Sequence, residues 1–179
     1  HQRTLDVAWS PEGKKIATCG YDKTVKIWDG VTGQLLQTFT GHQYPATCLA
    51  WGPEGKRIAS GSAKVSPEHG SKYPTATSVL ERDQVEGLRG EVKVWDVTSG
   101  KARTLLNVKE DYFRGVQWSH DGKHLGCISW KGFQLMDASS GRVMQKIDAI
   151  EVEGEKKPLK RTAWCPVSYG LLGVWRSEE

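Results

Sequence analysis

The sequence contains no long hydrophobic run. No stretch of its 179 residues approaches the eighteen or so apolar residues that cross a membrane, and the first ten, HQRTLDVAWS, lack the apolar core of a signal peptide. Low-complexity segments are also absent, whereas 37% of the residues are hydrophobic and eight are Trp. We therefore expect a soluble folded domain in the cytoplasm, with the nucleus as the alternative, and no membrane partner.

Cysteine is scarce and widely spaced. The four cysteines form no C-x-x-C pair, which argues against a zinc site or a disulfide framework. Each of them lies in a predicted strand beside small or apolar neighbours, where a thiol behaves as a small buried hydrophobe. They are Cys19, Cys48, Cys127 and Cys165. This usage is typical of a reducing, intracellular compartment.

The sequence also lacks an excess of one charge and the common motifs of ligand sites. Its 25 Lys and Arg residues against 21 Asp and Glu are too balanced to indicate nucleic acid unless the charge gathers on one face. No G-x-x-x-x-G-K-[ST] loop is present to hold a phosphate. Among five histidines, His120 and His124 have an i, i+4 spacing, but they flank a D-G turn. We therefore expect no metal ion and no cofactor.

What the sequence does have is a repeated unit. Four segments share a leading Trp and a following turn: WSPEGKKIATCG at 9–20, WGPEGKRIASGS at 51–62, WSHDGKHLGCIS at 118–129 and, more loosely, WCPVSYGLLGVW at 164–175. A second element follows the first three of them, as VKIWD, VKVWD and FQLMD. Both elements alternate in twos and end in tight turns, most of them containing Gly, a pattern typical of strands. Such repetition indicates a structural building unit.

This unit resembles the WD40 repeat, whose blades form a β-propeller. The leading Trp recurs after 42, 67 and 46 residues, close to the family's period apart from one insertion. Gly41-His42 supplies the G-H dipeptide of the family, and Trp28-Asp29 and Trp95-Asp96 supply its W-D dipeptide. The resemblance covers the chain apart from residues 64–90 and the last few. It implies an all-β fold of antiparallel four-stranded blades.

About three and a half blades are expected. They span about 1–41, 42–108 and 109–152, with a half blade at 153–179. Rings of this family usually close with about seven or eight blades, or roughly 300 residues. His1 lies eight positions before Trp9, much as His42 precedes Trp51, so the sequence is expected to start at a blade boundary. We expect the remaining blades to come from the same longer polypeptide or from another chain, because open edge strands are a liability.

The resemblance further implies a buried network in each blade, formed by the G-H histidine, a Ser or Thr of the second strand, a turn Asp and the W-D tryptophan. In the first blade the matching residues are His1, Thr18, Asp22 and Trp28. In the second they are His42, Ser60 and Trp95, and the Asp position falls on Arg89. In the third, Lys109, Gly126, Trp130 and Met136 replace all four. This decay favours a structural role over a Ser-His-Asp catalytic site, for which the sequence offers no nucleophile elbow.

An insertion at residues 64–90 interrupts the second blade between its second and third strands. Long insertions are usually functional or disordered, and in this family they lie on the rim that carries the connections between blades. The side chains assigned there to partner binding are Tyr21, Tyr44, Tyr112, Phe113, Arg114, Trp130 and Lys160. The run EGEKKPLKR at 153–161 is interpreted as a solvated linker between blades, with contact to an acidic partner as the alternative.

The sequence therefore predicts a non-catalytic protein-interaction scaffold or sensing propeller within a larger protein or complex. Two alternatives stay open. One is a propeller-fold enzyme whose site lies in the insertion or in the missing blades. The other is a nucleic-acid-binding propeller, for which strong salt dependence of binding would be the mark.

Overall fold

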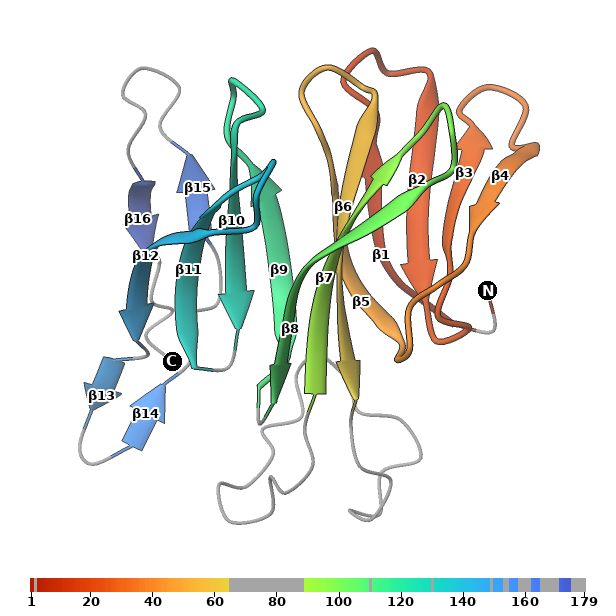
Figure 1. Cartoon of the computed structure of the whole chain (residues 1–179). Helices are drawn as coiled ribbons and strands as arrows, with labels where there is room; N and C mark the ends of the chain where they lie inside the picture. Colours follow the sequence, from red (N-terminus) through yellow and green to blue (C-terminus); the bar gives the residue numbers. More distant parts are fainter. Residues whose placement is uncertain are drawn as a thin grey trace.

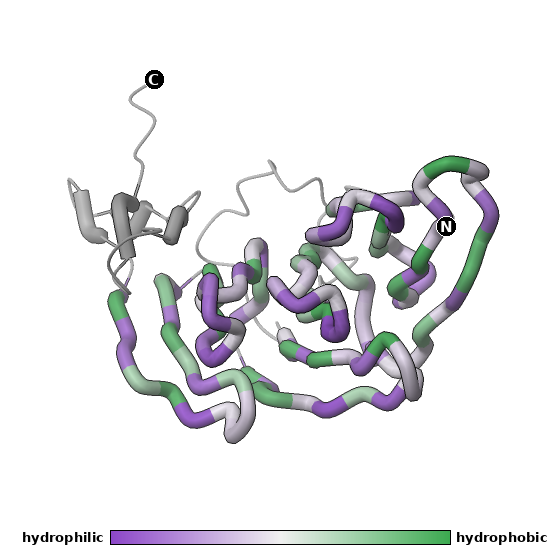
Figure 2. Tube along the Cα trace, turned by 90° about the horizontal axis from the view of Figure 1, so that it is seen from above, coloured by the Kyte–Doolittle hydropathy of each residue, from purple (hydrophilic) through white to green (hydrophobic). Residues whose placement is uncertain are grey.

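The computed structural model describes residues 1, 3–64, 89–109, 111–129 and 131–148, together with the backbone of four short strands between 150 and 174. Three antiparallel sheets of four strands each stand side by side in the order of the sequence (Figure 1). Within each sheet, strands that are consecutive in the chain pair with each other. Viewed from above, the three sheets are seen on end (Figure 2). The predicted all-β, blade-forming fold is confirmed.

The strands of the first blade are β1 (Thr4–Trp9), β2 (Lys15–Gly20), β3 (Val25–Asp29) and β4 (Leu35–Phe39). Those of the second are β5 (Ala46–Trp51), β6 (Arg57–Lys64), β7 (Arg89–Asp96) and β8 (Ala102–Lys109). The third blade contains β9 (Phe113–Trp118), β10 (His124–Ser129), β11 (Gly132–Asp137) and β12 (Val143–Asp148). Two short hairpins follow, made by β13 (Ile150–Val152) with β14 (Glu155–Lys157) and by β15 (Thr162–Trp164) with β16 (Leu171–Val174).

Two sequence-based expectations need correction. Residues 153–161 were interpreted as a linker, but residues 155–157 form β14, which pairs with β13. The insertion is also shorter than residues 64–90, because β6 runs on to Lys64 and β7 begins at Arg89. The reason is that the ladder between β6 and β7 continues through eight consecutive residue pairs before the chain leaves the sheet. Within the described residues, no helix is long and apolar enough to cross a membrane.

The hydrophobic core lies between the blades. One cluster joins the first two blades and includes Ile27, Phe39, Ile58 and Trp95, and the Phe39 and Trp95 rings stack with centroids 5.4 Å apart. A second cluster joins the second and third blades and includes Phe113, Leu125 and Met136. Alternate residues of a strand point to opposite faces, so each blade buries both of its faces against neighbours where neighbours exist. The blades therefore depend on one another for stability.

Three of the four cysteines belong to these clusters. Cys19, Cys48 and Cys127 are buried free thiols, and Cys165 lies outside the described residues. Burial raises the pKa of the Cys48 thiol to about 12. It also raises the pKa values of Cys19 and Cys127. A protonated thiol in such a place acts as a small hydrophobic side chain, and it is a poor nucleophile.

The recurrent leading Trp connects consecutive blades. Trp51 donates its indole N–H to the carbonyl oxygen of Ala8 in the first blade, at 3.2 Å. Trp118 makes the same contact one blade later, to the carbonyl oxygen of Ala50 at 3.2 Å. Trp9 holds the equivalent position in the first blade and is 55% exposed, because no other described blade packs against it. The repeated Trp is thus explained by contact between blades.

The recurrent Asp of the W-D dipeptide organises the turn that follows the third strand. Asp29 accepts hydrogen bonds from the amides of Val31 and Thr32 and from the Thr32 hydroxyl, between 2.7 and 3.0 Å. Asp96 and Asp137 bind their own turns in the same way. These bonds hold the carboxylate pKa values below the usual range. The Asp is therefore a turn residue in all three blades, and no catalytic role is needed to explain it.

Candidate functional site

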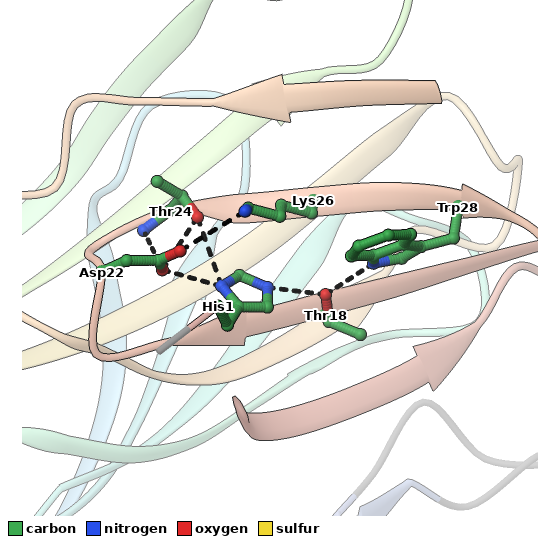
Figure 3. A network of polar contacts seen from close by, with 6 residues as sticks. All are labelled: His1, Thr18, Asp22, Thr24, Lys26 and Trp28. Atoms are coloured by element: carbon green, nitrogen blue, oxygen red, sulfur yellow. Dashed lines mark hydrogen bonds and ion pairs between the residues drawn. The ribbon is translucent and has the colours of Figure 1, made fainter. Parts of the chain in front are cut away.

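A network of polar side chains joins β2, β3 and the amino-terminal residue of the first blade (Figure 3). His1 lies between Asp22 and Thr18, with Nδ1 2.7 Å from Asp22 Oδ1 and Nε2 2.7 Å from Thr18 Oγ1. Trp28 donates its indole N–H to the same Thr18 oxygen at 2.8 Å. Thr24 donates its hydroxyl to Asp22 at 2.9 Å. The structure thus brings together all four residues that the sequence assigned to this network.

The hydrogen bonds form one directional chain when the imidazole is neutral with its proton on Nδ1. In this arrangement Trp28 donates to Thr18, the Thr18 hydroxyl donates to His1, and His1 donates to Asp22. Each polar atom in the chain then has a partner. The result is a brace between two strands and the chain segment that precedes them.

The second blade repeats this chain with a different carboxylate. His42 Nδ1 lies 2.8 Å from Glu91 Oε1, and its Nε2 lies 2.6 Å from Ser60 Oγ. Trp95 donates to Ser60 Oγ at 2.7 Å. The prediction that the acidic position of this blade falls on Arg89 is therefore wrong. The network of the second blade is complete.

The spacing of the first blade misled the sequence analysis. Asp22 lies six residues before Trp28, in the tight turn between β2 and β3, and the same spacing from Trp95 leads to Arg89. In the second blade β6 and β7 are longer, and the carboxylate comes instead from within β7, four residues before Trp95. Glu has one more methylene than Asp, so Glu91 reaches the histidine from the strand itself. An acidic residue either six or four positions before the W-D tryptophan is the sequence signal that identifies Glu91.

The second network is more deeply buried than the first. His42, Ser60, Glu91 and Trp95 are all buried, with Glu91 only 2% exposed, whereas Trp28 of the first blade is half-buried. Burial by itself would raise the pKa of Glu91. The hydrogen bonds from His42 and the Gln43 amide, together with the nearby charge of Lys93, lower it to about 2. Glu91 is therefore a carboxylate at neutral pH, held by compensating donors.

The buried second network has the residue types of a hydrolase triad but not the access. Ser60 has no exposed surface, and its oxygen is already bonded to both His42 and Trp95. A substrate carbonyl therefore cannot reach it without opening the blade. The geometry supports a structural brace in each of the first two blades.

The third blade has lost this chain. Gly126 and Met136 occupy two of its positions and are buried, Lys109 is exposed, and Trp130 lies outside the described residues. A buried carboxylate that the sequence pattern does not reveal lies near the start of this blade. Asp111 is 3% exposed, and its Oδ1 accepts hydrogen bonds from the amides of Tyr112 and Lys131. It fastens the β10–β11 turn to the connection that leads into β9.

Most residues assigned to partner binding lie next to strand ends on the side where β6 ends and β7 begins. These strand ends form the lower edge of the blades in Figure 1. Tyr21, Tyr44, Tyr112 and Arg114 are all half-buried there. The guanidinium of Arg3 lies 5.7 Å from the centre of the Tyr21 ring. Burial raises the pKa of Tyr112.

Three of the residues assigned to partner binding are not part of the surface that the structure describes. Phe113 is completely buried between the second and third blades, so its assignment to partner binding is wrong. A sequence pattern of aromatic residues near a strand end could not separate an anchor for a partner from a core residue. Trp130 and Lys160 lie outside the described residues.

The blades, their Trp contacts and their histidine networks define a β-propeller segment. A sequence profile of the family described as "WD domain, G-beta repeat" matches residues 1–29 and 33–64. Residues 1–64 therefore carry WD40 repeats.

Curated relatives match either one repeat or most of the chain. A Notchless protein homolog of Arabidopsis thaliana is 46% identical over 25% of this chain and 10% of its own length. A Chromatin assembly factor 1 subunit FAS2 homolog of Oryza sativa subsp. japonica is 26% identical over 97% of this chain and 37% of its own length. Topless-related protein 4 of Arabidopsis thaliana is 50% identical over 22% of this chain and 4% of its own length. The chain therefore spans well under half the length of these relatives.

Proposed function

We propose that this chain is a non-catalytic protein-interaction module, a scaffold or sensing part of a larger propeller protein or complex. The proposal rests on a difference between the side chains of the histidine networks and those on the insertion rim. The side chains of both histidine networks are bonded to one another, and those of the second blade, such as Ser60 and His42, are also buried. The aromatic and basic side chains on the insertion rim remain at the surface or half-buried. This rim is the part of the molecule that offers contacts to another protein.

The opposite rim is engaged in holding the blades together. Arg57 there lies over the Trp118 ring at 4.5 Å and donates to the carbonyl oxygen of Gly122 at 2.9 Å. It also pairs with Glu54 of its own turn. Because one such turn resembles the next in sequence, this rim supplies little discrimination between partners. Partner binding through the insertion rim is favoured for that reason.

The relatives support a role in an assembly. The rice relative that matches most of the chain is by its printed name a subunit of a chromatin assembly factor. We propose that the remaining blades come from the same polypeptide or from another chain and pack on the exposed Trp9 face. A nuclear location is compatible with that relative, and the cytoplasm is the other location we propose.

Site-specific photo-crosslinking in the complete polypeptide tests the proposed function. A photoreactive amino acid replaces Tyr44 on the insertion rim or, as the matched control, Lys56 on the opposite rim. We expect a protein partner to be captured from position 44, and capture to decrease when Tyr112→Ala or Arg114→Glu is added. Capture from position 56 that is unaffected by these substitutions would move the site to the other rim and contradict the proposal.

A further inference from the structure

Three cations are aligned across the second blade at its insertion rim. The register pairs Lys64 of β6 with Arg89 of β7, and Arg89 in turn with Lys109 of β8. Directly opposed residues of antiparallel strands project from the same face of the sheet. All three side chains are exposed. We call Lys64, Arg89 and Lys109 the cation row.

The cation row has no counterpart in the other two blades. On this rim the ladder of the first blade ends earlier, at Cys19, Val25 and Phe39. That of the third ends at Ser129, Gly132 and Asp148, so neither blade carries a row of cations there. The row therefore does not follow from the repeat. It is a property of the second blade.

No carboxylate of the described residues neutralises the row. None of the ion pairs found there includes Lys64, Arg89 or Lys109. Glu91 lies two residues from Arg89 on the same face, but it is buried and held by His42, the Gln43 amide and Lys93. Like charges placed directly opposite each other destabilise a sheet. The three cations therefore lower the stability of the sheet. A bound anionic group would offset their repulsion, so we interpret the row as a binding site for such a group.

Two segments that carry tyrosines lie against β7 near the cation row. The Gln43 amide bonds to Glu91, so the connection that carries Tyr44 lies on the face of β7 from which the row projects. On the other face, Gly90 approaches Tyr112 so closely that a Cβ atom at Gly90 would lie 2.8 Å from the Tyr112 Cα. The cations therefore share a face of β7 with the segment that carries Tyr44, and the segment that carries Tyr112 lies behind the strand. Cations combined with aromatic side chains are typical of protein-recognition surfaces.

We propose that the cation row binds an acidic, extended peptide segment of a protein partner. This inference rests on the proposed function and specifies the chemistry of the partner. Strands of a sheet lie about 4.8 Å apart, so the row spans roughly 10 Å. In an extended peptide, alternate side chains on one edge are about 7 Å apart, so two carboxylates fit within this span. A single phosphate would instead require donors that converge on one point.

Binding of a fluorescein-labelled peptide of alternating Glu and Ser, followed by fluorescence anisotropy, tests this inference. The rim variant is Lys64→Glu/Arg89→Glu/Lys109→Glu in the complete polypeptide. The control variant, Lys14→Glu/Lys56→Glu/Lys101→Glu, changes the net charge equally with exposed lysines of the opposite rim. We expect the rim variant to bind about tenfold more weakly or worse, and the control variant to bind as the parent does within about twofold.

A second variant distinguishes loss of peptide binding from loss of folding. Arg89→Gln removes the central cation, so we expect it to weaken peptide binding while the melting temperature stays the same or rises. A fall in melting temperature would assign the row a structural role and overturn the inference. Equal losses in the rim and control variants would show that only net charge is sensed. Tighter binding of a single-stranded oligonucleotide that depends on the same three residues would identify a nucleic-acid surface instead.

The same variants separate this inference from the proposed function. If the rim variant still yields the partner cross-link from position 44 but the acidic peptide does not bind the parent, the acidic partner is wrong and the interaction module stands. If the peptide binds through the cation row but no protein is captured from position 44, the proposed partner surface fails and the anion site remains.

Discussion

His42 and Glu91 are 49 residues apart in the sequence, and their side chains meet at 2.8 Å inside the second blade. The pair connects the segment entering the blade to its third strand, and Ser60 and Trp95 extend it across the sheet. Both side chains are almost completely buried. Such a pair stabilises the blade only while all its partners are in place.

The stability of the protein should therefore depend on Glu91 at acidic pH. Its pKa lies at about 2 in the folded protein against an ordinary value of 4.5. A lowered folded-state pKa contributes stability that is present above about 4.5 and is lost as the pH falls toward 2. We expect Glu91→Gln to be less stable at neutral pH by roughly 2–3 kcal/mol and to show a shallower decline below pH 4.5. Urea unfolding of the parent and the Glu91→Gln variant at a series of pH values measures both the difference at neutral pH and the decline below pH 4.5. Parallel declines in the two proteins would contradict this role for Glu91.

The two W-D tryptophans should differ in their contribution to stability. Trp95 is 1% exposed, stacks on Phe39 and bonds to Ser60, whereas Trp28 is half-buried. We expect Trp95→Ala to cost about 3–5 kcal/mol and Trp28→Ala about half as much. Trp95→Phe keeps most of the apolar surface and should cost about 1–3 kcal/mol through loss of the hydrogen bond to the buried Ser60 oxygen. Equal costs for Trp28→Ala and Trp95→Ala in denaturant titrations would disprove the difference.

Arg57 should hold the second and third blades together on the rim opposite the insertion. Its guanidinium lies over Trp118 and donates to the carbonyl oxygen of Gly122. We expect Arg57→Ala to lower the free energy of unfolding by about 1–2 kcal/mol. Arg57→Lys, which copies Lys15 at the matching position of the first blade, should recover only part of this loss because Lys lacks the planar fork. Full recovery with Lys would show that charge alone matters there.

Trp9 and Trp51 should respond very differently to the same substitution. Trp51 is 8% exposed and bonds to Ala8, whereas Trp9 is 55% exposed. In this chain we expect Trp51→Ala to cost about 3–5 kcal/mol and Trp9→Ala less than about 1 kcal/mol. In a polypeptide with another blade packed on the Trp9 face, the cost of Trp9→Ala should approach that of Trp51→Ala. Thermal unfolding of the two pairs of variants makes the comparison.

Local pattern was sufficient to predict the blades. The alternation of side chains, the turn residues and the recurring Trp are properties of short segments, and each specifies a strand or a turn without help from distant residues. The strands Lys15–Gly20 and Gly132–Asp137, for example, have the bounds that their own residues predict. The spacing between His, Thr and Trp in the first blade likewise follows from a regular unit.

Contacts between distant segments were decided by the tertiary structure. Glu91 replaces the expected acidic residue because β6 and β7 extend past the usual turn, and the length of a ladder depends on pairing across an insertion. Phe113 is a core residue because two blades meet over it. The cation row exists only through the register of β6, β7 and β8, which brings together charges 25 and 20 positions apart in the sequence. Sequence periodicity determines which side of a strand a residue occupies, but only the packed sheets determine which other residues share that side.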